Sequence, residues 1–199
     1  MAIVTTVDIL RHGEARGGSR YRGVTDDALT ERGWRQMYRQ CGELHWDVVA
    51  SSPLRRCRSF AAAWCEQQQA ELRVDPAWAE YDFGAWEGLT ADRIESEWPG
   101  ALAAFYRDPE RCPPPNAENF GGFNRRVHAA WENLLADCAG KKVLVVSHAG
   151  VVRSLFGHCL QLPLEKIFHI EIPQAGLTRF TAFDSEDGRY LQFNFHRPG

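Results

Sequence analysis

Three short segments of the sequence contain the side chains best suited to chemistry. They are Arg-His-Gly-Glu at residues 11–14, Ser-Ser-Pro-Leu-Arg-Arg at residues 51–56 and Ser-His-Ala-Gly at residues 147–150. A guanidinium group pairs with phosphate oxygens, and an imidazole can attack phosphorus or donate a hydrogen bond to a phosphoryl oxygen. One such histidine or arginine alone is more often structural. Two histidines and several arginines brought together predict a phosphate-binding site.

Each of the three segments follows a stretch that is typical of a β-strand. Residues 3–10 are rich in β-branched side chains, and residues 47–51 and 143–147 are short apolar runs. Such runs suit strands that are buried on both faces of a parallel sheet. The carboxyl ends of parallel strands lie along one edge of the sheet, where open sheets form their binding sites. We therefore expect the three segments to converge.

Apolar residues with helical spacing indicate helices between and after these strands. The expected helices cover 34–44, 54–64, 120–138 and 151–159. The second follows Ser52-Pro53, a pair that suits a helix start. Two more strands are expected at 178–183 and 190–195, joined by an Asp-Gly turn. This alternation predicts an α/β fold, a three-layer sandwich with a mostly parallel sheet and helices on both faces. The length predicts a single domain over residues 1–199.

Charge and composition narrow the expected partners. A formal net charge of −3 argues against nucleic acid or an anionic membrane as the main partner. No apolar run approaches the roughly 20 residues needed to cross a bilayer. Residues 1–10 lack the features of a secretion signal, which favours a cytoplasmic location. The six cysteines form no CxxC pair and no zinc-like spacing, so we expect no metal site.

Four motifs resemble the histidine phosphatase superfamily, also called the phosphoglycerate mutase-like superfamily. They are LRHGE at 10–14, SSPLRR at 51–56, AEYDFGAWEG at 79–88 and VVSHAG at 145–150. The motifs occur in the order that is typical of that family. The resemblance extends from residue 7 to about residue 180, and it implies a phosphoglycerate mutase-like sandwich.

The resemblance also implies a catalytic role for five residues. His12 would be the nucleophile, forming a phosphohistidine, and it must be neutral to attack. Arg11 and Arg56 would bind phosphoryl oxygens, and His148 would donate a hydrogen bond to the phosphoryl group from the opposite side. Glu80 would be the general acid, because a dianionic phosphate nearby favours its protonated form. No cofactor is implied.

The loop after Glu14 departs from the family pattern. Many relatives have a Thr and then a phosphate-binding Asn here, and this chain lacks that Asn. Arg16, Ser19 or the backbone amides of Gly17-Gly18 are expected to substitute for it. Arg20 could instead guide a charged substrate from outside the pocket. The expected phosphate- and substrate-binding set is Arg11, Gly13, Ser19, Arg20, Arg56, His148 and Ala149.

Two of these assignments have rivals. Glu87 and Asp82 lie in the same motif as Glu80 and compete with it as the general acid. Arg55 takes the place of Arg56 if the register of the motif differs by one residue.

Hydrolysis is the expected reaction. The cofactor-dependent mutases of the superfamily carry a basic insertion after the acid motif, whereas residues 89–97 here are mixed and rather acidic. A site that does not hold the intermediate while closed lets water resolve the phosphohistidine. Two alternatives stay open: a phosphoryl-transfer isomerase of the mutase type, and a non-catalytic phosphoryl-binding protein on the same fold.

Among the phosphatases, the segments 86–88, 114–120 and 162–164 are most similar to the alpha-ribazole phosphatases, whose substrate carries a benzimidazole-like base. Aromatic residues that could stack with such a base are Tyr81, Phe83, Trp86, Trp98, Phe105 and Tyr106, although at least half of them are expected to be packing residues. His169 is expected near the pocket rim. The expected partner is a small phosphorylated metabolite, with alpha-ribazole 5′-phosphate as one candidate. The chain is expected to be a monomer or a homodimer.

Overall fold

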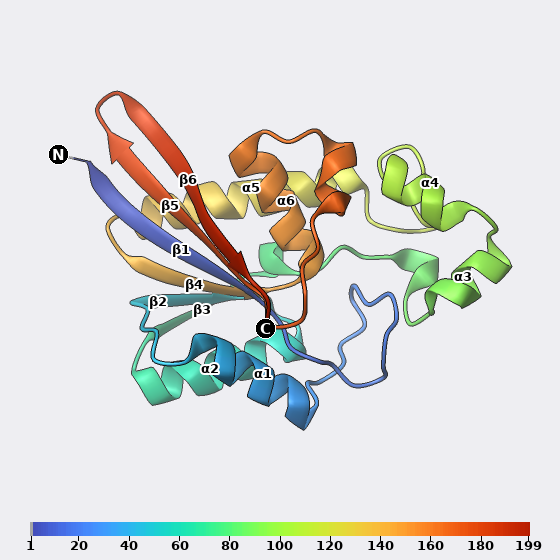
Figure 1. The fold of residues 1–199 in the computed structure, drawn as a ribbon, viewed down its shortest axis with the longest axis horizontal. Helices are drawn as coiled ribbons and strands as arrows, with labels where there is room; N and C mark the ends of the chain where they lie inside the picture. Colours follow the sequence, from blue (N-terminus) through green and yellow to red (C-terminus); the bar gives the residue numbers. More distant parts are fainter. Residues whose placement is uncertain (1) are drawn as a thin grey trace.

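A six-stranded sheet lies at the centre of the computed structural model, which describes residues 2–199 (Figure 1). Its strands are β1 (Ile3–Arg11), β2 (Val48–Ser51), β3 (Glu71–Val74), β4 (Lys142–Ser147), β5 (Leu177–Ser185) and β6 (Gly188–Arg197). The strand order is β3-β2-β4-β1-β5-β6. The first four of these are parallel, and β5 and β6 form an antiparallel hairpin at one edge. The sheet is therefore mostly parallel.

Helices cover both faces of the sheet because its central strands are apolar on both faces (Figure 1). The covering helices are α5 (Phe120–Asp137) and α6 (Ala149–Leu160) on one face and α1 (Glu31–Cys41) and α2 (Arg55–Gln68) on the other. Side chains of β4 alternate between the two cores: Val145 packs with α5 and α6, whereas Val146 packs with α1 and α2. The protein is thus a three-layer α/β sandwich, as its sequence predicts.

Smaller elements lie beyond the carboxyl ends of the parallel strands (Figure 1). They are the 3₁₀ helices η1 (Pro76–Trp78), η2 (Gly84–Trp86) and η3 (Leu164–His169) and the short helices α3 (Ala91–Glu97) and α4 (Ala101–Arg107). The Thr90 side chain caps α3 by accepting a hydrogen bond from the Arg93 amide. Phe105 anchors α4 because its ring is buried in the core that includes α5. These elements form one wall above the edge of the sheet where the sequence places the polar segments.

The two ends of the described chain lie at different ends of the sheet (Figure 1). The last residue, Gly199, lies against Gln174 and Ala175, and a Cβ at position 199 would be 2.3 Å from the Gln174 carbonyl oxygen. The Ala175 amide in turn donates a hydrogen bond to the His12 carbonyl (3.2 Å). The C-terminus therefore packs next to the residue after β1.

Most of the expected elements are present. The four expected helices correspond to α1, α2, α5 and α6, and the hairpin turn precedes Gly188. The short strand β3 and helix α4 were not predicted. The expected helix start at Ser52-Pro53 was two residues early: Leu54 is the N-cap residue of α2, and the Ser52 hydroxyl accepts from the Leu54 amide (3.3 Å) and bonds His148 (2.8 Å).

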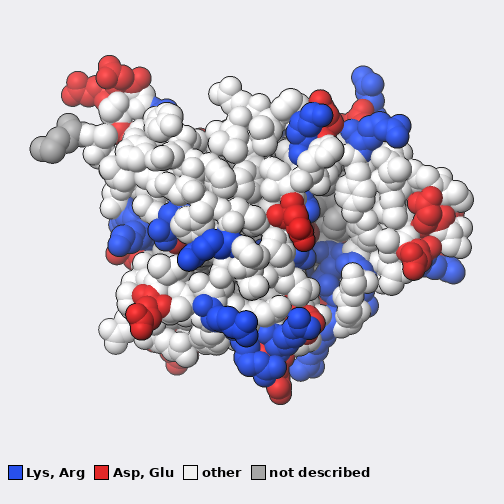
Figure 2. Space-filling model, viewed as in Figure 1, with Lys and Arg blue, Asp and Glu red and all other residues white. Residues whose placement is uncertain are grey.

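The surface is hollowed between the part that contains α3 and α4 and the rest of the molecule, and basic side chains gather beside this hollow (Figure 2). Among residues 2–199, no helix is both long enough and apolar enough to cross a bilayer.

Candidate active site

The three polar segments meet at the carboxyl ends of three adjacent strands, β1, β4 and β2. The His12 amide bonds the Ser147 carbonyl (2.9 Å), and the Ser52 amide bonds the Val146 carbonyl (3.0 Å), so the chain continues the sheet pairing into the site. The rings of His12 and His148 lie edge to face, with centroids 5.3 Å apart. The expected convergence of the segments is confirmed.

The His12 ring is held in one tautomer. Its Nδ1 lies 2.7 Å from the Gly13 carbonyl oxygen. A carbonyl oxygen can only accept a hydrogen bond, so Nδ1 carries the proton and Nε2 keeps a free lone pair. Burial, together with the charges of Arg56 and Arg11, holds the pKa of His12 well below its usual value. The imidazole is therefore neutral and has the tautomer that a nucleophile needs.

His148 is neutral as well, in the opposite tautomer. Its Nδ1 accepts a hydrogen bond from Nε of Arg56 (3.3 Å), so Nε2 carries the proton and donates to the Ser52 hydroxyl (2.8 Å). Burial and the charge of Arg56 hold the pKa of His148 well below its usual value. The ring is fully buried beside His12, and its one N–H is bonded to Ser52.

Arg56 is fully buried, and backbone carbonyls orient its guanidinium group. Nη1 donates to the Thr25 carbonyl (2.8 Å), and Nη2 donates to the Gly23 carbonyl (2.8 Å). Arg55, the alternative in the neighbouring register, is exposed. Arg56 is therefore the arginine that lies with the two histidines.

Arg11 has a buried donor with no partner. Nη1 bonds the Ile172 carbonyl (2.5 Å), whereas the buried Nε has no hydrogen-bond partner within residues 2–199. Burial lowers the pKa of Arg11, and Glu80 nearby acts in the opposite direction. A buried, unpaired guanidinium donor indicates a position for an anion.

Glu80 and Arg11 line the same cleft, whose lining does not include either histidine. Its carboxylate accepts hydrogen bonds from the amides of Gly150 and Tyr81 (3.1 Å each). A Cβ at Gly150 would lie 2.3 Å from the Glu80 carboxylate, so only glycine allows this contact at the start of α6. Arg126 fixes the loop by donating to the carbonyls of Ala79 (2.8 Å) and Glu80 (3.1 Å).

Glu87 and Asp82, the alternatives to Glu80 as the general acid, accept hydrogen bonds from backbone amides of neighbouring loops. Glu87 Oε1 accepts from the amides of Gly23, Val24 and Phe83 (2.8, 3.1 and 3.1 Å), and Oε2 accepts from the amide and hydroxyl of Thr25 (3.0 and 2.5 Å). Asp82 accepts from the Gly84 amide (2.9 Å). Glu87 thus fastens the loop that holds Arg56 to the loop that carries Glu80.

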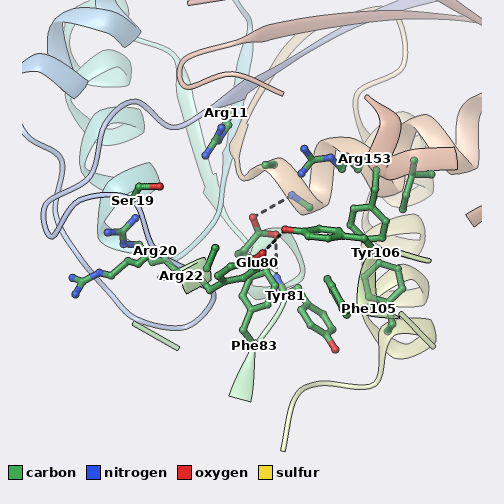
Figure 3. A pocket seen from close by; sticks show the side chains of 17 residues that line it. Arg11, Ser19, Arg20, Arg22, Glu80, Tyr81, Phe83, Phe105, Tyr106 and Arg153 are labelled. Atoms are coloured by element: carbon green, nitrogen blue, oxygen red, sulfur yellow. Dashed lines mark hydrogen bonds between the residues drawn. The ribbon is translucent and has the colours of Figure 1, made fainter. Parts of the chain in front are cut away.

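A cleft of about 350 Å³ opens beside these groups (Figure 3). Its charged and hydroxyl side chains are those of Arg11, Ser19, Arg20, Arg22, Glu80 and Arg153, and its aromatic side chains those of Tyr21, Tyr81, Phe83, Phe105, Tyr106, Phe120 and Phe168. Ala91, Ala149, Gly150 and Ile167 complete the lining. Figure 3 shows Arg11, Arg20 and Arg22 on one side of Glu80, and Tyr106, Phe105 and Arg153 on the other. One side of the cleft therefore suits a phosphate group, and the other suits an apolar or flat substituent.

Some of the residues expected to bind substrate line this cleft, and others do not. Ser19, Arg20 and Ala149 line it, whereas Arg16 is an exposed residue outside its lining. Arg20 also pairs with Asp27 (2.7 Å). Of the expected aromatic residues, Trp86 and Trp98 do not line the cleft, and His169 borders the adjoining hollow instead.

Sequence reasoning missed three lining residues with polar side chains, Tyr21, Arg22 and Arg153, and the apolar Phe120 and Phe168. The available signal for Arg153 was a basic residue among the apolar residues of the helix at 151–159. Within the described chain, no group of three or more His, Cys, Asp or Glu side chains is placed to hold a metal ion.

The comparison with protein families gives one match over nearly the whole chain: the model of the histidine phosphatase superfamily (branch 1) matches residues 7–195. The chain belongs to this superfamily. The family that four motifs of the sequence predict is therefore confirmed.

Relatives within the superfamily carry different names. A bifunctional protein of Mycobacterium tuberculosis is 31% identical over 180 residues, which make up 87% of this chain and 49% of that protein, so this chain spans about half its length. The adenosylcobalamin/alpha-ribazole phosphatase of Salmonella typhimurium is 30% identical over 171 residues, 83% of this chain and 85% of the relative. A solved structure of a mycobacterial glucosyl-3-phosphoglycerate phosphatase in complex with VO3 is 25% identical, with a TM-score of 0.86, and the match covers 98% of this chain and 99% of that one.

Proposed function

We propose that this chain is a metal-independent phosphomonoester hydrolase that works through a phosphohistidine on His12. The observation that carries the proposal is the His12 ring, which is buried, neutral and bonded through Nδ1 to the Gly13 carbonyl (2.7 Å). The ring lies edge to face with His148, with centroids 5.3 Å apart, and Arg56 and Arg11 are near enough for their charges to lower its pKa. A binding protein would need neither such a nucleophile nor the carboxylate of Glu80.

The reaction has two balanced steps. In the first, the Nε2 lone pair of His12 attacks phosphorus, the bond to the ester oxygen breaks, and protonated Glu80 gives its proton to the leaving oxygen. Arg11, Arg56 and His148 stabilise the charge on the phosphoryl oxygens. In the second, the Glu80 carboxylate takes a proton from water, the water oxygen attacks phosphorus, and the electron pair of the P–N bond returns to His12.

The composition of residues 89–97, the segment that follows the loop of Glu80 and Glu87, favours hydrolysis over isomerisation. A mutase has to hold the substrate acid while the intermediate waits, and residues 89–97 contain one basic side chain, Arg93, which is exposed and close to Glu97 (3.4 Å). We propose that residues 1–199 act as one catalytic domain on a small phosphorylated metabolite in the cytoplasm, as a monomer or a homodimer.

Alpha-ribazole 5′-phosphate is the individual substrate to test first. The 30% identity to an adenosylcobalamin/alpha-ribazole phosphatase and the aromatic lining of the cleft support it. A flat base would stack against Tyr106 or Phe83, while its ribose phosphate reaches His12.

The decisive experiment is hydrolysis of p-nitrophenyl phosphate, with a chelator present, by the wild type and by His12→Ala. We expect the wild type to be active and the variant to lose at least about a thousandfold in kcat/KM, because the nucleophile is gone. The exposed His45, which precedes β2 at the other end of that strand, gives the matched control His45→Ala with unchanged rate. Activity that needs a metal, or that survives in His12→Ala, contradicts the proposal.

A further inference from the structure

Arg126, on α5, bonds the backbone of the segment that carries Glu80. Its Nη1 donates to the carbonyls of Ala77 and Ala79 (2.8 Å each), and its Nη2 donates to the carbonyl of Glu80 itself (3.1 Å). Nε and Nη2 also donate to the two carboxylate oxygens of Glu118 (2.7 and 2.9 Å). A guanidinium group has five N–H donors, so these five acceptors use its full capacity.

Glu118, just before α5, extends these contacts to the other side of Glu80. Its amide donates to the Asp82 carbonyl (3.0 Å), and its Oε2 accepts from the Asp82 amide (3.4 Å). The side chains of Arg126 and Glu118 are only 26% and 24% exposed, so solvent screens their ion pair less than it screens a pair on the open surface. One ion pair beside α5 therefore holds the backbone on both sides of Glu80.

Arg126 has no donor left for a substrate. Glu80 lies in the cleft (Figure 3), whereas Arg126 is not among the residues that line it. The guanidinium carbon of Arg126 lies 4.8 Å from the centre of the Phe123 ring. A Cβ at Gly150 would lie 3.4 Å from that ring and 2.3 Å from the Glu80 carboxylate, so Phe123 packs near both groups. The contacts of Arg126 thus reach the chemistry through the place of Glu80.

That place matters because proton transfer is sensitive to distance. A general acid has to lie about 2.6–3.2 Å from the oxygen that it protonates, and a shift of about 1 Å can cost roughly a hundredfold in rate. The Glu80 carboxylate has two backbone donors, the amides of Gly150 and Tyr81, and the second belongs to the same segment as Glu80. If the segment moves, the carboxyl group moves with it.

We propose that Arg126 is a positioning residue that acts on the reaction through Glu80, so that it speeds the departure of strongly basic leaving groups. The inference rests on the proposed function, in which Glu80 is the general acid. Phenolate is a strong base and needs the proton of Glu80 as the ester bond breaks, whereas p-nitrophenolate is a weak base and leaves with little help. Loss of Arg126 should therefore slow phenyl phosphate more than p-nitrophenyl phosphate.

The test compares kcat/KM for phenyl phosphate with kcat/KM for p-nitrophenyl phosphate, both measured by phosphate release. This quantity covers the steps up to the phosphohistidine, so the later attack of water, which both substrates share, does not enter it. In Arg126→Met we expect the ratio of phenyl to p-nitrophenyl phosphate to fall about tenfold or more, since general acid catalysis contributes roughly 10²–10⁴-fold. Damage to the phosphate-binding groups lowers both rates and leaves the ratio unchanged.

Three comparisons assign the fall to Glu80. Glu80→Gln should lower the same ratio at least as much as Arg126→Met does. Arg126→Met added to Glu80→Gln should lower it no further, because residues that act as one unit are not additive. Arg125→Met, which removes the exposed neighbouring arginine of α5, should keep the wild-type ratio.

The other outcomes contradict the inference. An unchanged ratio in Arg126→Met overturns it, while a lower ratio in Glu80→Gln still supports the proposed function. A further fall in the double variant, or an equal fall in Arg125→Met, also overturns it. If Arg126→Met shows no cooperative unfolding transition, Glu118→Gln decides, because it removes one acceptor of the same guanidinium, and an unchanged ratio there rejects the inference. An unchanged ratio in Glu80→Gln, or no hydrolysis by the wild type, rejects the inference together with the proposed role of Glu80.

Discussion

The two histidines of the site are kept neutral by their surroundings. His12 and His148 are both buried, and each has Arg56 as a neighbouring positive charge that opposes protonation. The tautomers are opposite because Nδ1 of His12 meets a carbonyl acceptor, whereas Nδ1 of His148 meets the Arg56 donor. One backbone oxygen and one guanidinium therefore decide which ring offers a lone pair and which offers a proton.

These histidines make the folded state sensitive to acid. Their pKa values are lower in the folded than in the unfolded chain, where a histidine titrates near 6.5. The stability that they contribute is complete above about pH 6.5 and is lost as the pH falls below it, because only the unfolded chain takes up the protons. Between pH 7.5 and 5.5 we expect each to remove about 1.4 kcal/mol from the free energy of unfolding.

Urea unfolding at pH 7.5, 6.5 and 5.5 measures this loss. The loss should be smaller in His12→Asn and His148→Asn than in the wild type, and as large as in the wild type in the exposed control His45→Asn. Equal losses in all four proteins would show that the two rings are protonated in the folded state.

At the scale of elements, Glu87 joins two loops that are distant in sequence. One loop, residues 22–25, supplies the carbonyls that orient Arg56, and the other carries Glu80. Because one carboxylate bonds both loops, Arg56 and Glu80 keep fixed positions relative to each other.

Glu87→Gln tests this coupling. The variant replaces one acceptor oxygen with an NH₂ group, which cannot accept from the Thr25 amide and hydroxyl. We expect the free energy of unfolding to fall by about 1.5–3 kcal/mol. KM for p-nitrophenyl phosphate should rise as Arg56 loses its support. Glu66→Gln, on the exposed face of α2, is the control; wild-type KM and stability in Glu87→Gln would contradict the coupling.

The sequence predicts the central strands and the helices that cover them, because burial in or against the sheet requires a regular apolar pattern. The strands before Arg11 and Ser147 and the helices that cover them have long periodic patterns, so their ends, and hence the two histidines, could be located. β3 and α4 are short, and β3 has no buried residue, so neither has a pattern of its own. Arg153 could not be assigned because its place in the cleft depends on how α4 and η3 fold back onto α6.

At the scale of the whole molecule, a second buried charge lies away from the chemistry. Asp8 is fully buried in β1, paired with Arg179 of β5 (2.7 Å) and bonded by Trp46 Nε1 (2.8 Å). It precedes His12 by four residues, or roughly 13 Å of extended strand.

A substitution in the Asp8–Arg179 pair should therefore lower stability without changing activity. Arg179→Met leaves the Asp8 carboxylate buried without its cation, and we expect the free energy of unfolding to fall by about 3 kcal/mol or more. Below the unfolding transition, kcat for p-nitrophenyl phosphate should stay within about twofold of the wild type, because such sites are independent. Urea unfolding and steady-state kinetics on the same sample measure both quantities, and a folded but inactive variant would contradict the separation. The exposed Arg189, on β6, is less suitable than Arg179 for this test, because Arg189 pairs with two carboxylates.

The position of the C-terminus decides how this protein should be tethered for such measurements. Gly199 packs on Ala175, whose amide holds the His12 carbonyl, and a side chain at position 199 would collide with the Gln174 carbonyl. An affinity tag or fusion partner attached there would begin within contact distance of Ala175, whose amide bonds the His12 carbonyl. When the protein is immobilised on a sensor surface, attachment before β1, at the far end of the sheet, keeps the tether away from these residues.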